Sequence, residues 1–290
     1  MPKTLECVTY HKWSQEFGEE PSSKLLATQP TPNLAINLDS DIIHLDVLGR
    51  SIIVLDSEEA TTELLEKRSS LYSGRPRMPM INELMGRSFD FGFMTYGKML
   101  VFLEILGLII FTRRSMMHQQ FHPNAATRFQ PYELKACHGL LRRLLDDPTN
   151  LLEKLRHMAG ETIMEIAYGL QIQEKDDPYI VAAERAGESI SIAAVQGAFL
   201  VDVLPILKYV PDWMPFAGFK RRAKEWRELT LAMVNHPFQA TMRNIESGHF
   251  TPSFVSYSLE NIDEAGDVEL QKDVIKSTAG IMYSGQHTCL

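Results

Sequence analysis

Helical periodicity dominates this sequence from residue 109 onward and constrains its fold more than any other feature. Apolar residues recur there at the three-to-four-residue spacing of amphipathic helices. Pro211 and Pro215 interrupt the pattern, because proline cannot continue a helix. The chain is therefore expected to be a mainly α-helical array. The predicted helices are Ile109–Phe121, Ala125–Leu145, Thr149–Gly169, Asp177–Ile192, Phe219–Ser247 and Leu270–Leu290.

A small β-hairpin and a short helix are predicted before this array. Ile42–Leu48 and Ser51–Leu55 are apolar or β-branched runs, and the Gly49-Arg50 pair between them suits a tight turn. Asp56 is expected to cap the next helix while Glu59 reaches back to it. That helix should end near Lys67, and its inward-facing residues should be Ala60, Leu64 and Leu65.

Two segments are predicted to be loops, and the second has room for one short helix. Residues 18–39 contain three prolines, and residues 72–97 are rich in glycine, proline and methionine. The methionines and phenylalanines of the second loop are compatible with either core packing or a wall that contacts a ligand. They are Met78, Met80, Met85, Met94, Phe89, Phe91 and Phe93.

Charge and cysteine content exclude several classes of protein. The net charge of −8 disfavours a nucleic-acid partner. The odd cysteine count argues against a disulfide framework and favours a reducing, intracellular compartment, with Cys137 expected in a helical core. Residues 1–17 lack the apolar stretch of a signal peptide or membrane anchor. Met99–Phe111 is apolar but short for a membrane span, and it contains Glu104.

A set of short strings gains specificity from its order along the chain. The strings are Asp46–Leu55 followed by Ser57–Ala60, then Tyr72–Pro76, Phe93–Gly97 and Phe199–Pro215. In this order they resemble the first half of fungal cytochrome P450 monooxygenases, in which F-x-P-Y-G is similar to Phe93–Gly97 and the last string is an apolar connector over the substrate entrance. The resemblance implies that residues 1–290 are a single, incomplete domain forming the N-terminal portion of that fold.

The resemblance also implies a chemistry and a location. Family members are haem-thiolate enzymes that hydroxylate hydrophobic small molecules with O2 and electrons from an NADPH-cytochrome reductase. They act on the cytoplasmic side of the endoplasmic reticulum. Aligning the string Met116-Met117-His118 with the family implies that Arg114 and His118 lie on the haem-propionate side, with Ile110 in place of a tryptophan. Phe91, Phe93 and Phe199 are the implied substrate contacts.

The long central helix that activates oxygen in the family is implied at residues 270–290. Its A/G-G-x-D/E-T motif is degenerate here. One register places His287 at the acid position with Thr288 as the hydroxyl, and the other places Thr288 at the acid with Cys289 as the threonine. The candidate catalytic residues are therefore Gly285, His287, Thr288 and Cys289, and neither register supplies a carboxylate for proton delivery.

Two further kinds of departure distinguish this chain from the family it resembles. Residues 18–39 and 98–110 interrupt matched flanks and are interpreted as insertions, such as untranslated sequence retained in a gene model. The haem loop F-x-x-G-x-R-x-C-x-G is absent, so the proximal cysteine is missing. The 290 residues are therefore expected to be inactive alone. The rival interpretation is a non-catalytic helical remnant or gene-model artefact that binds no haem.

A metal site is not expected. His118 and His122 have the i, i+4 spacing of helical zinc ligands, but two ligands cannot close a site and Pro123 ends the helix there.

Overall fold

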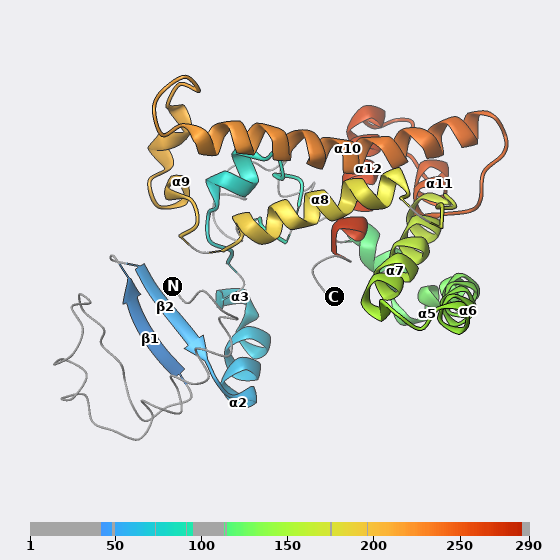
Figure 1. Cartoon of the computed structure of the whole chain (residues 1–290), viewed down its shortest axis with the longest axis horizontal. Coiled ribbons are helices and arrows are strands. Elements are labelled where there is room, and N and C mark those ends of the chain that lie inside the picture. Colours follow the sequence, from blue (N-terminus) through green and yellow to red (C-terminus); the bar gives the residue numbers. More distant parts are fainter. Residues whose placement is uncertain are drawn as a thin grey trace. The chain divides into compact units, whose positions relative to one another are not determined.

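A computed structural model describes residues 42–47, 50–72, 74–90, 92–94, 113, 115–174, 176–195 and 197–285. The chain divides into two compact units, residues 1–74 and 75–290. Figure 1 shows one antiparallel pair of strands and a majority of helices, as predicted. The predicted insertions at 18–39 and 98–110 lie outside the described residues, as does the apolar run 99–111.

The first unit holds the predicted hairpin. Strand β1 (Ile42–Val47) pairs with β2 (Arg50–Leu55), and Val47 lies opposite Arg50. The two residues between the strands are therefore 48 and 49, one position earlier than predicted. Arg50 belongs to the second strand because it pairs in the ladder.

The helix after the hairpin begins one residue later than expected. It is built from α2 (Glu58–Thr61), the π-helical η2 (Thr62–Lys67) and α3 (Ser69–Tyr72). Its cap is Ser57 rather than Asp56: the Ser57 hydroxyl accepts the Ala60 N–H at 3.1 Å. Ala60 and Leu64 are half-buried as predicted, but Leu65 is exposed. We attribute this to the wider π-helical turn, which changes the angle between successive side chains.

All six predicted helices of the second unit have counterparts in the structure. The helix predicted at Ala125–Leu145 corresponds to three consecutive elements in the structure. One seven-residue helix, α11, was not predicted. The bounds are η3 Met80–Leu84, the helical residues 115–121, α5 Pro123–Ala126, η4 Thr127–Phe129, α6 Gln130–Asp146, α7 Leu151–Tyr168, α8 Pro178–Ala193, α9 Leu200–Val203, η5 Pro205–Tyr209, α10 Gly218–Glu246, α11 Phe254–Glu260 and α12 Val268–Gly285.

Local chemistry explains where the main helices begin and end. Asp177 caps α8 by accepting N–H groups from Tyr179 and Ile180 at 2.8 and 3.3 Å, and Pro178 occupies the first turn. Helix α7 ends at Tyr168, and the next residue, Gly169, caps it with a left-handed φ of +68°. Ser253 and Ser256 form a reciprocal capping box at the start of α11.

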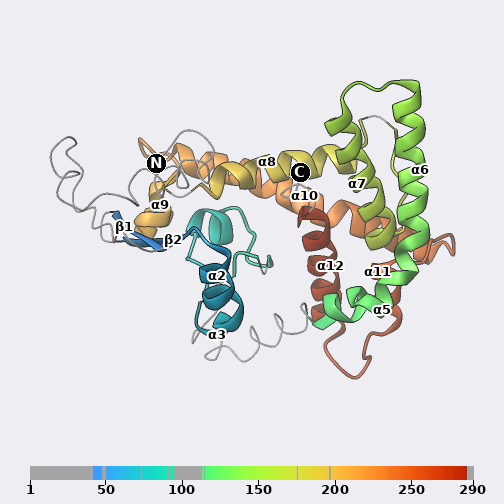
Figure 2. The same ribbon diagram turned by 90° about the horizontal axis from the view of Figure 1, so that it is seen from below.

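Helix α12 lies at the centre of the second unit. It packs against α7, α8, α10 and α11, while α8 and α10 run side by side (Figures 1 and 2). The contact with α10 is close: a Cβ added at Gly280 would lie 2.9 Å from Cγ2 of Val234. Tyr168 and Tyr283 meet edge to face with their ring centroids 6.4 Å apart. The central core therefore depends on a small residue in α12 and on buried aromatic rings around it.

Candidate functional site

Two of the three predicted substrate contacts lie in one apolar cluster. Phe199 is buried beside η3 and the end of α8, and the half-buried Phe93 packs against the same group. The Phe199 ring meets Trp226 of α10 edge to face at 5.8 Å. The fully buried methionines Met80 and Met85 complete much of this wall. Residues of η3, Met85 and Phe93 thus pack with Phe199 and Val201 in one apolar cluster.

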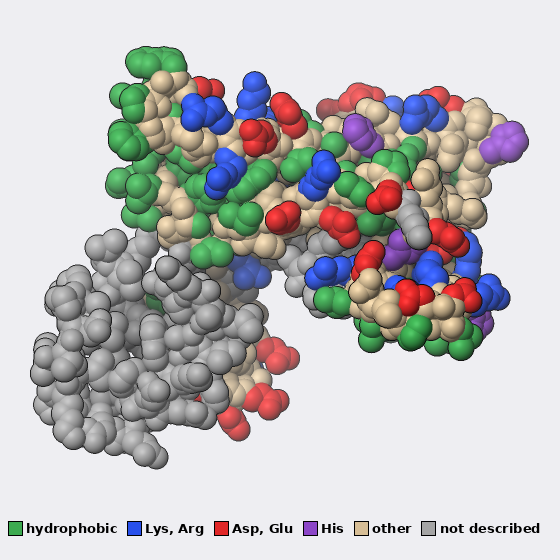
Figure 3. All heavy atoms as spheres, in the orientation of Figure 1, with side chains coloured by type: hydrophobic (Ala, Val, Ile, Leu, Met, Phe, Trp, Pro, Cys, Tyr) green, Lys and Arg blue, Asp and Glu red, His purple; other side chains and the backbone are tan. Residues whose placement is uncertain are grey.

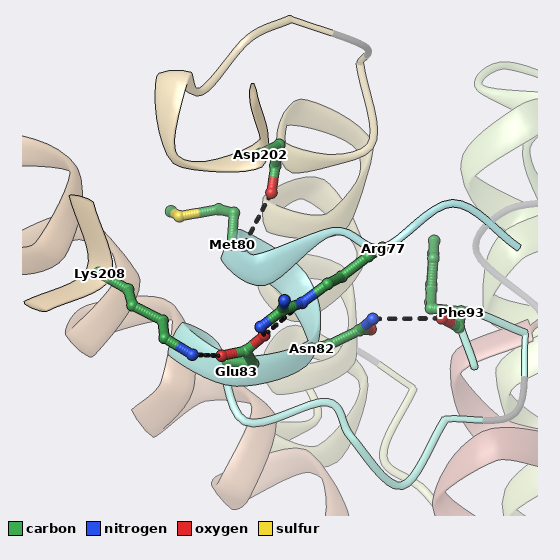
Figure 4. A network of polar contacts seen from close by, with 7 residues as sticks. All are labelled: Arg77, Met80, Asn82, Glu83, Phe93, Asp202 and Lys208. Atoms are coloured by element: carbon green, nitrogen blue, oxygen red, sulfur yellow. Dashed lines mark hydrogen bonds and ion pairs between the residues drawn. The ribbon is translucent and has the colours of Figure 1, made fainter. Parts of the chain in front are cut away.

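A polar network fixes these two segments to each other (Figure 4). The buried carboxylate of Asp202 accepts the Met80 N–H at 2.9 Å, and the Asn82 amide donates to the Phe93 carbonyl at 3.2 Å. Glu83 accepts hydrogen bonds from Arg77 at 2.7 Å and from Lys208 of η5. The contacts of Asp202 with Met80 and of Lys208 with Glu83 join residues 122 and 125 positions apart and hold α9 and η5 against η3.

The pKa values of Glu83 and Lys208 are both shifted in the direction that favours the ion pair between them. Partial burial alone would raise the pKa of Glu83, but hydrogen bonds from Lys208 and Arg77 outweigh it and hold that pKa below its usual value. The hydrogen bond to Glu83 raises the pKa of Lys208. Both partners therefore remain ionised at neutral pH.

Two buried arginines contact the turn at residues 87–90. Arg87 is fully buried and donates from Nη2 to Asp90 at 3.0 Å. Arg113 is 5% exposed, donates from Nη1 to the Phe89 carbonyl at 3.0 Å and lies 3.9 Å from the Asp273 carboxylate. Burial lowers the pKa of Arg113 despite the nearby carboxylates of Asp273 and Asp90.

Both arginines retain donors without an acceptor. In the described part of the chain, Nε and Nη1 of Arg87 and Nε of Arg113 have no hydrogen-bond partner. Unsatisfied buried donors are costly, and a carboxylate is the group that best satisfies a guanidinium fork. The residues present therefore fit an anionic carboxylate ligand at this turn. Sequence reasoning selected Arg114 and missed Arg87 and Arg113. The available signal was an arginine inside a Met- and Phe-rich segment with an aspartate three residues later.

Of the other predicted site residues, the structure describes His118 and Gly285. His118 is exposed, with its ring centroid 6.1 Å from that of His122. Gly285 is the exposed last residue of α12. Among the described residues, no group of three His, Cys, Asp or Glu side chains could hold a metal. The predictions that lie outside the described residues are Phe91, Arg114, His287, Thr288 and Cys289.

A separate concavity of about 550 Å³ lies between α6, α7 and α12. Its lining is mostly apolar and includes Cys137 and Met282. Cys137 was expected in the core but is exposed, because it lies on the open side of α6. Phe93, Phe199, His118 and Gly285, the predicted site residues that the structure describes, are not among those that line this concavity.

No protein-family model matches the chain. Individual proteins do match it. It is 39% identical over 285 residues to cytochrome P450 monooxygenase 98 of Postia placenta, covering 98% of this chain and 49% of that protein. It is 40% identical over 240 residues to the tryptamine 4-monooxygenase of Psilocybe cyanescens, covering 83% of this chain and 45% of that protein.

The fold agrees with these sequence matches. A zebrafish cytochrome P450 solved with progesterone superposes with a TM-score of 0.61 over 98% of this chain and 56% of that one, at 13% identity. Within the described ranges, no helix has both the length and the apolar character to cross a bilayer. By sequence the chain is similar along nearly its whole length to fungal cytochrome P450 monooxygenases, by fold it matches a cytochrome P450, and it spans about half the length of the curated relatives it matches.

Proposed function

We propose that these residues form part of a haem-thiolate monooxygenase that hydroxylates a hydrophobic small molecule, using O2 and electrons from a reductase. The observation that carries the proposal is the 39% identity to a fungal cytochrome P450 monooxygenase along 98% of the chain. The family implies a haem cofactor, a hydrophobic substrate and a redox partner. The endoplasmic reticulum surface, where an NADPH-cytochrome reductase is available, is the proposed location.

The described residues can supply two parts of such a site. Arg87 and Arg113 would hold a propionate of the haem, since their unpaired donors are buried and suited to a carboxylate. Phe93 and Phe199 would form an apolar substrate wall that excludes water. When bound, the haem supplies the oxidising chemistry, for which the family uses a cysteine thiolate ligand.

The end of α12 is the proposed side for oxygen activation. Gly285, followed by His287, Thr288 and Cys289, would supply hydroxyl, imidazole or thiol groups rather than the carboxylate of the family motif. Arg114 and His118 remain proposed contacts on the propionate side, and Phe91 a proposed substrate contact. Residues 18–39 and 98–110 remain proposed insertions within a single P450 domain.

We further propose that the 290 residues do not form a thiolate-ligated haem centre by themselves. The string F-x-x-G-x-R-x-C is not among them, so no cysteine has the required sequence context. The competing possibility is a helical remnant that binds no haem in any setting.

The test compares two chains. One is the 290-residue chain alone, and the other is the same chain fused to the part of the Postia placenta protein that it does not match. Both are reduced and exposed to carbon monoxide. The proposal expects the Soret band of a thiolate-ligated carbonyl complex from the fusion only. A Soret band of this kind from the 290 residues alone would contradict the proposal that they form no thiolate-ligated haem centre by themselves. A fusion that is helical but holds no haem would favour the helical remnant that binds no haem.

The arginine assignment needs its own comparison within the fusion. Arg87→Met and Arg113→Met should each lower haem retention during gel filtration, because each removes a donor to the carboxylate. Arg222→Met is the matched control, since Arg222 is exposed. Equal retention in all three variants would refute the assignment.

A further inference from the structure

Helix α6 exposes a row of apolar side chains along its outer side. Leu134 is 59% exposed, Leu141 is 57% exposed and Leu145 is 84% exposed. Cys137 lies between the first two of these leucines and is exposed as well. Figure 3 shows hydrophobic side chains along the lower edge of the lobe that α6 and α7 form. Exposed apolar side chains gathered in one place mark a contact surface.

The inner side of α6 is already occupied by the fold. Helix α6 packs against α7, and α7 packs in turn against α12 (Figure 2). On this inner side Ala136 is 1% exposed, and Arg143 pairs with Glu161 of α7 at 3.1 Å. A partner that approaches the outer side would therefore meet a helix that is already formed. Binding to it would not bear the entropy cost of ordering a helix.

The spacing of the outer row is that of a coiled-coil seam. Leu134, Cys137, Leu141 and Leu144 follow one another at intervals of 3, 4 and 3 residues, which are successive a and d positions of a heptad repeat. The first three are exposed and Leu144 is half-buried. We call these four side chains the α6 seam. Such a seam fits another helix that carries the same spacing.

The residues that flank the α6 seam complement their own copies. In a parallel pair of helices, a g residue meets the e residue five positions later on the other helix. Glu133 is such a g residue and His138 is the matching e residue, and Leu140 and Leu145 repeat the relation one heptad later. Within the described part of the chain, Glu133 and His138 have no hydrogen bond or ion pair of their own. A carboxylate would thus face an imidazole, and a leucine would face a leucine.

We propose that two copies of this chain associate through their α6 seams as a parallel, two-fold symmetric pair. An interface of this kind is isologous, so each seam residue meets the same residue of the other copy and no second surface is required. Leu134 and Leu141 would lose their contact with water at its centre, and Glu133 of each copy would pair with His138 of the other. The association depends on neither haem nor catalysis, so the 290-residue chain is the protein to test.

Sedimentation velocity over a range of concentrations measures the association. We expect an equilibrium between monomer and dimer. Leu141→Glu removes two leucines from each dimer and places two like charges in the seam, so it should raise the dissociation constant at least about a hundredfold. Leu231→Glu is the matched control, because Leu231 is 45% exposed on α10, outside the seam. The control should dimerise as the parent chain does.

Cross-linking with a short bismaleimide tests the orientation, in chains that carry Cys7→Ser and Cys289→Ser. Cys137 should link to Cys137 of the other copy. With Cys137→Ser added, Leu134→Cys and Leu144→Cys should each cross-link too, because parallel helices bring every seam position beside its own copy. These two positions are ten residues apart, about 15 Å along the helix, so an antiparallel pair could link at most one of them. A link at only one position would overturn the parallel arrangement.

Exchanging the flanking charges tests the register. Glu133→Lys and His138→Glu should each weaken the dimer by about threefold, as expected for exposed ion pairs. The double variant should recover most of the loss, because it restores opposite charges at the same two positions. Losses that simply add would contradict the pairing of Glu133 with His138.

Far-UV circular dichroism must show unchanged helicity in every variant. A parent chain that sediments as a monomer at all concentrations overturns the proposal, as does a Leu141→Glu chain that dimerises as well as the control. The fusion to the unmatched part of the Postia placenta protein gives the last comparison. A dimeric fusion supports the pairing of two copies, whereas a monomeric fusion would assign the α6 seam to the remainder of a longer chain.

Discussion

Gly169 offers the sharpest test of the packing between α7 and the segment before α11. It has φ +68°, and a Cβ built on it would lie 2.4 Å from the Thr251 carbonyl oxygen. Gly248 has a similar φ of +74°, but no described atom lies within 4 Å of its added Cβ. Both glycines follow the end of a helix. The two positions therefore share the conformational cost of an alanine and differ only in the space available.

The magnitudes follow from this difference. Alanine in the left-handed region costs about 1–2 kcal/mol, partly offset by the lower entropy of the unfolded chain, so Gly248→Ala should lose about 1 kcal/mol. Gly169→Ala must also displace a backbone carbonyl by about 1 Å to restore ordinary contact, which adds roughly 1–3 kcal/mol by analogy with overpacked cores. Its total loss should be about 2–4 kcal/mol.

Urea unfolding of both variants, followed by far-UV circular dichroism, measures the two losses. The transition midpoint should fall much further for Gly169→Ala than for Gly248→Ala, with similar slopes that indicate an unchanged extent of unfolding. Equal midpoint shifts would refute the close approach of Thr251 to the end of α7.

Three further predictions concern other contacts of the second unit. Gly280→Ala should lose roughly 1–3 kcal/mol in the urea assay because its Cβ would crowd Val234, and adding Val234→Ala should recover part of that loss; strict additivity would contradict the contact. Asp177→Ala should lose about 1–2 kcal/mol as α8 loses its cap, and a loss no greater than that of an exposed surface substitution would contradict the cap. Hydrogen bonds from Lys208 and Arg77 hold the folded-state pKa of Glu83 below its usual value, so its ionised form stabilises the fold at pH values above that usual pKa. The stability advantage of the parent chain over Glu83→Gln should therefore be present at pH 7 and disappear as the pH falls through the folded-state pKa; a difference that stays constant with pH would contradict the ion pair with Lys208.

Local signals predicted the helices better than the site. The Asp177-Pro178 start of α8 was predictable because capping chemistry acts within one turn. The capping residue of α2 was misplaced by one position because Asp56 and Ser57 are both good caps, and only the backbone conformation selects Ser57. Helix α11 was missed because its cap uses Ser256 in place of a glutamate or glutamine.

The site depends on contacts between distant parts of the sequence. Phe93 and Phe199 were chosen through resemblance, and the structure places both in one cluster. The Asp202–Met80 contact joins residues 122 positions apart, which no local pattern encodes. Arg87 and Arg113 were not selected because burial determines their importance and arginine is ordinarily an exposed residue; the only local hint was Asp90 three residues after Arg87.

The unpaired guanidinium donors of Arg87 and Arg113 should affect how much folded protein accumulates in a cell. Without an anionic ligand they lower the stability of the folded chain, and a bound carboxylate would recover that loss. Proteolysis acts on the unfolded fraction, so ligand supply during synthesis should govern how much protein accumulates. Expression yield should then be higher in cells that supply such an anionic ligand, and cells without it should clear the chain soon after translation.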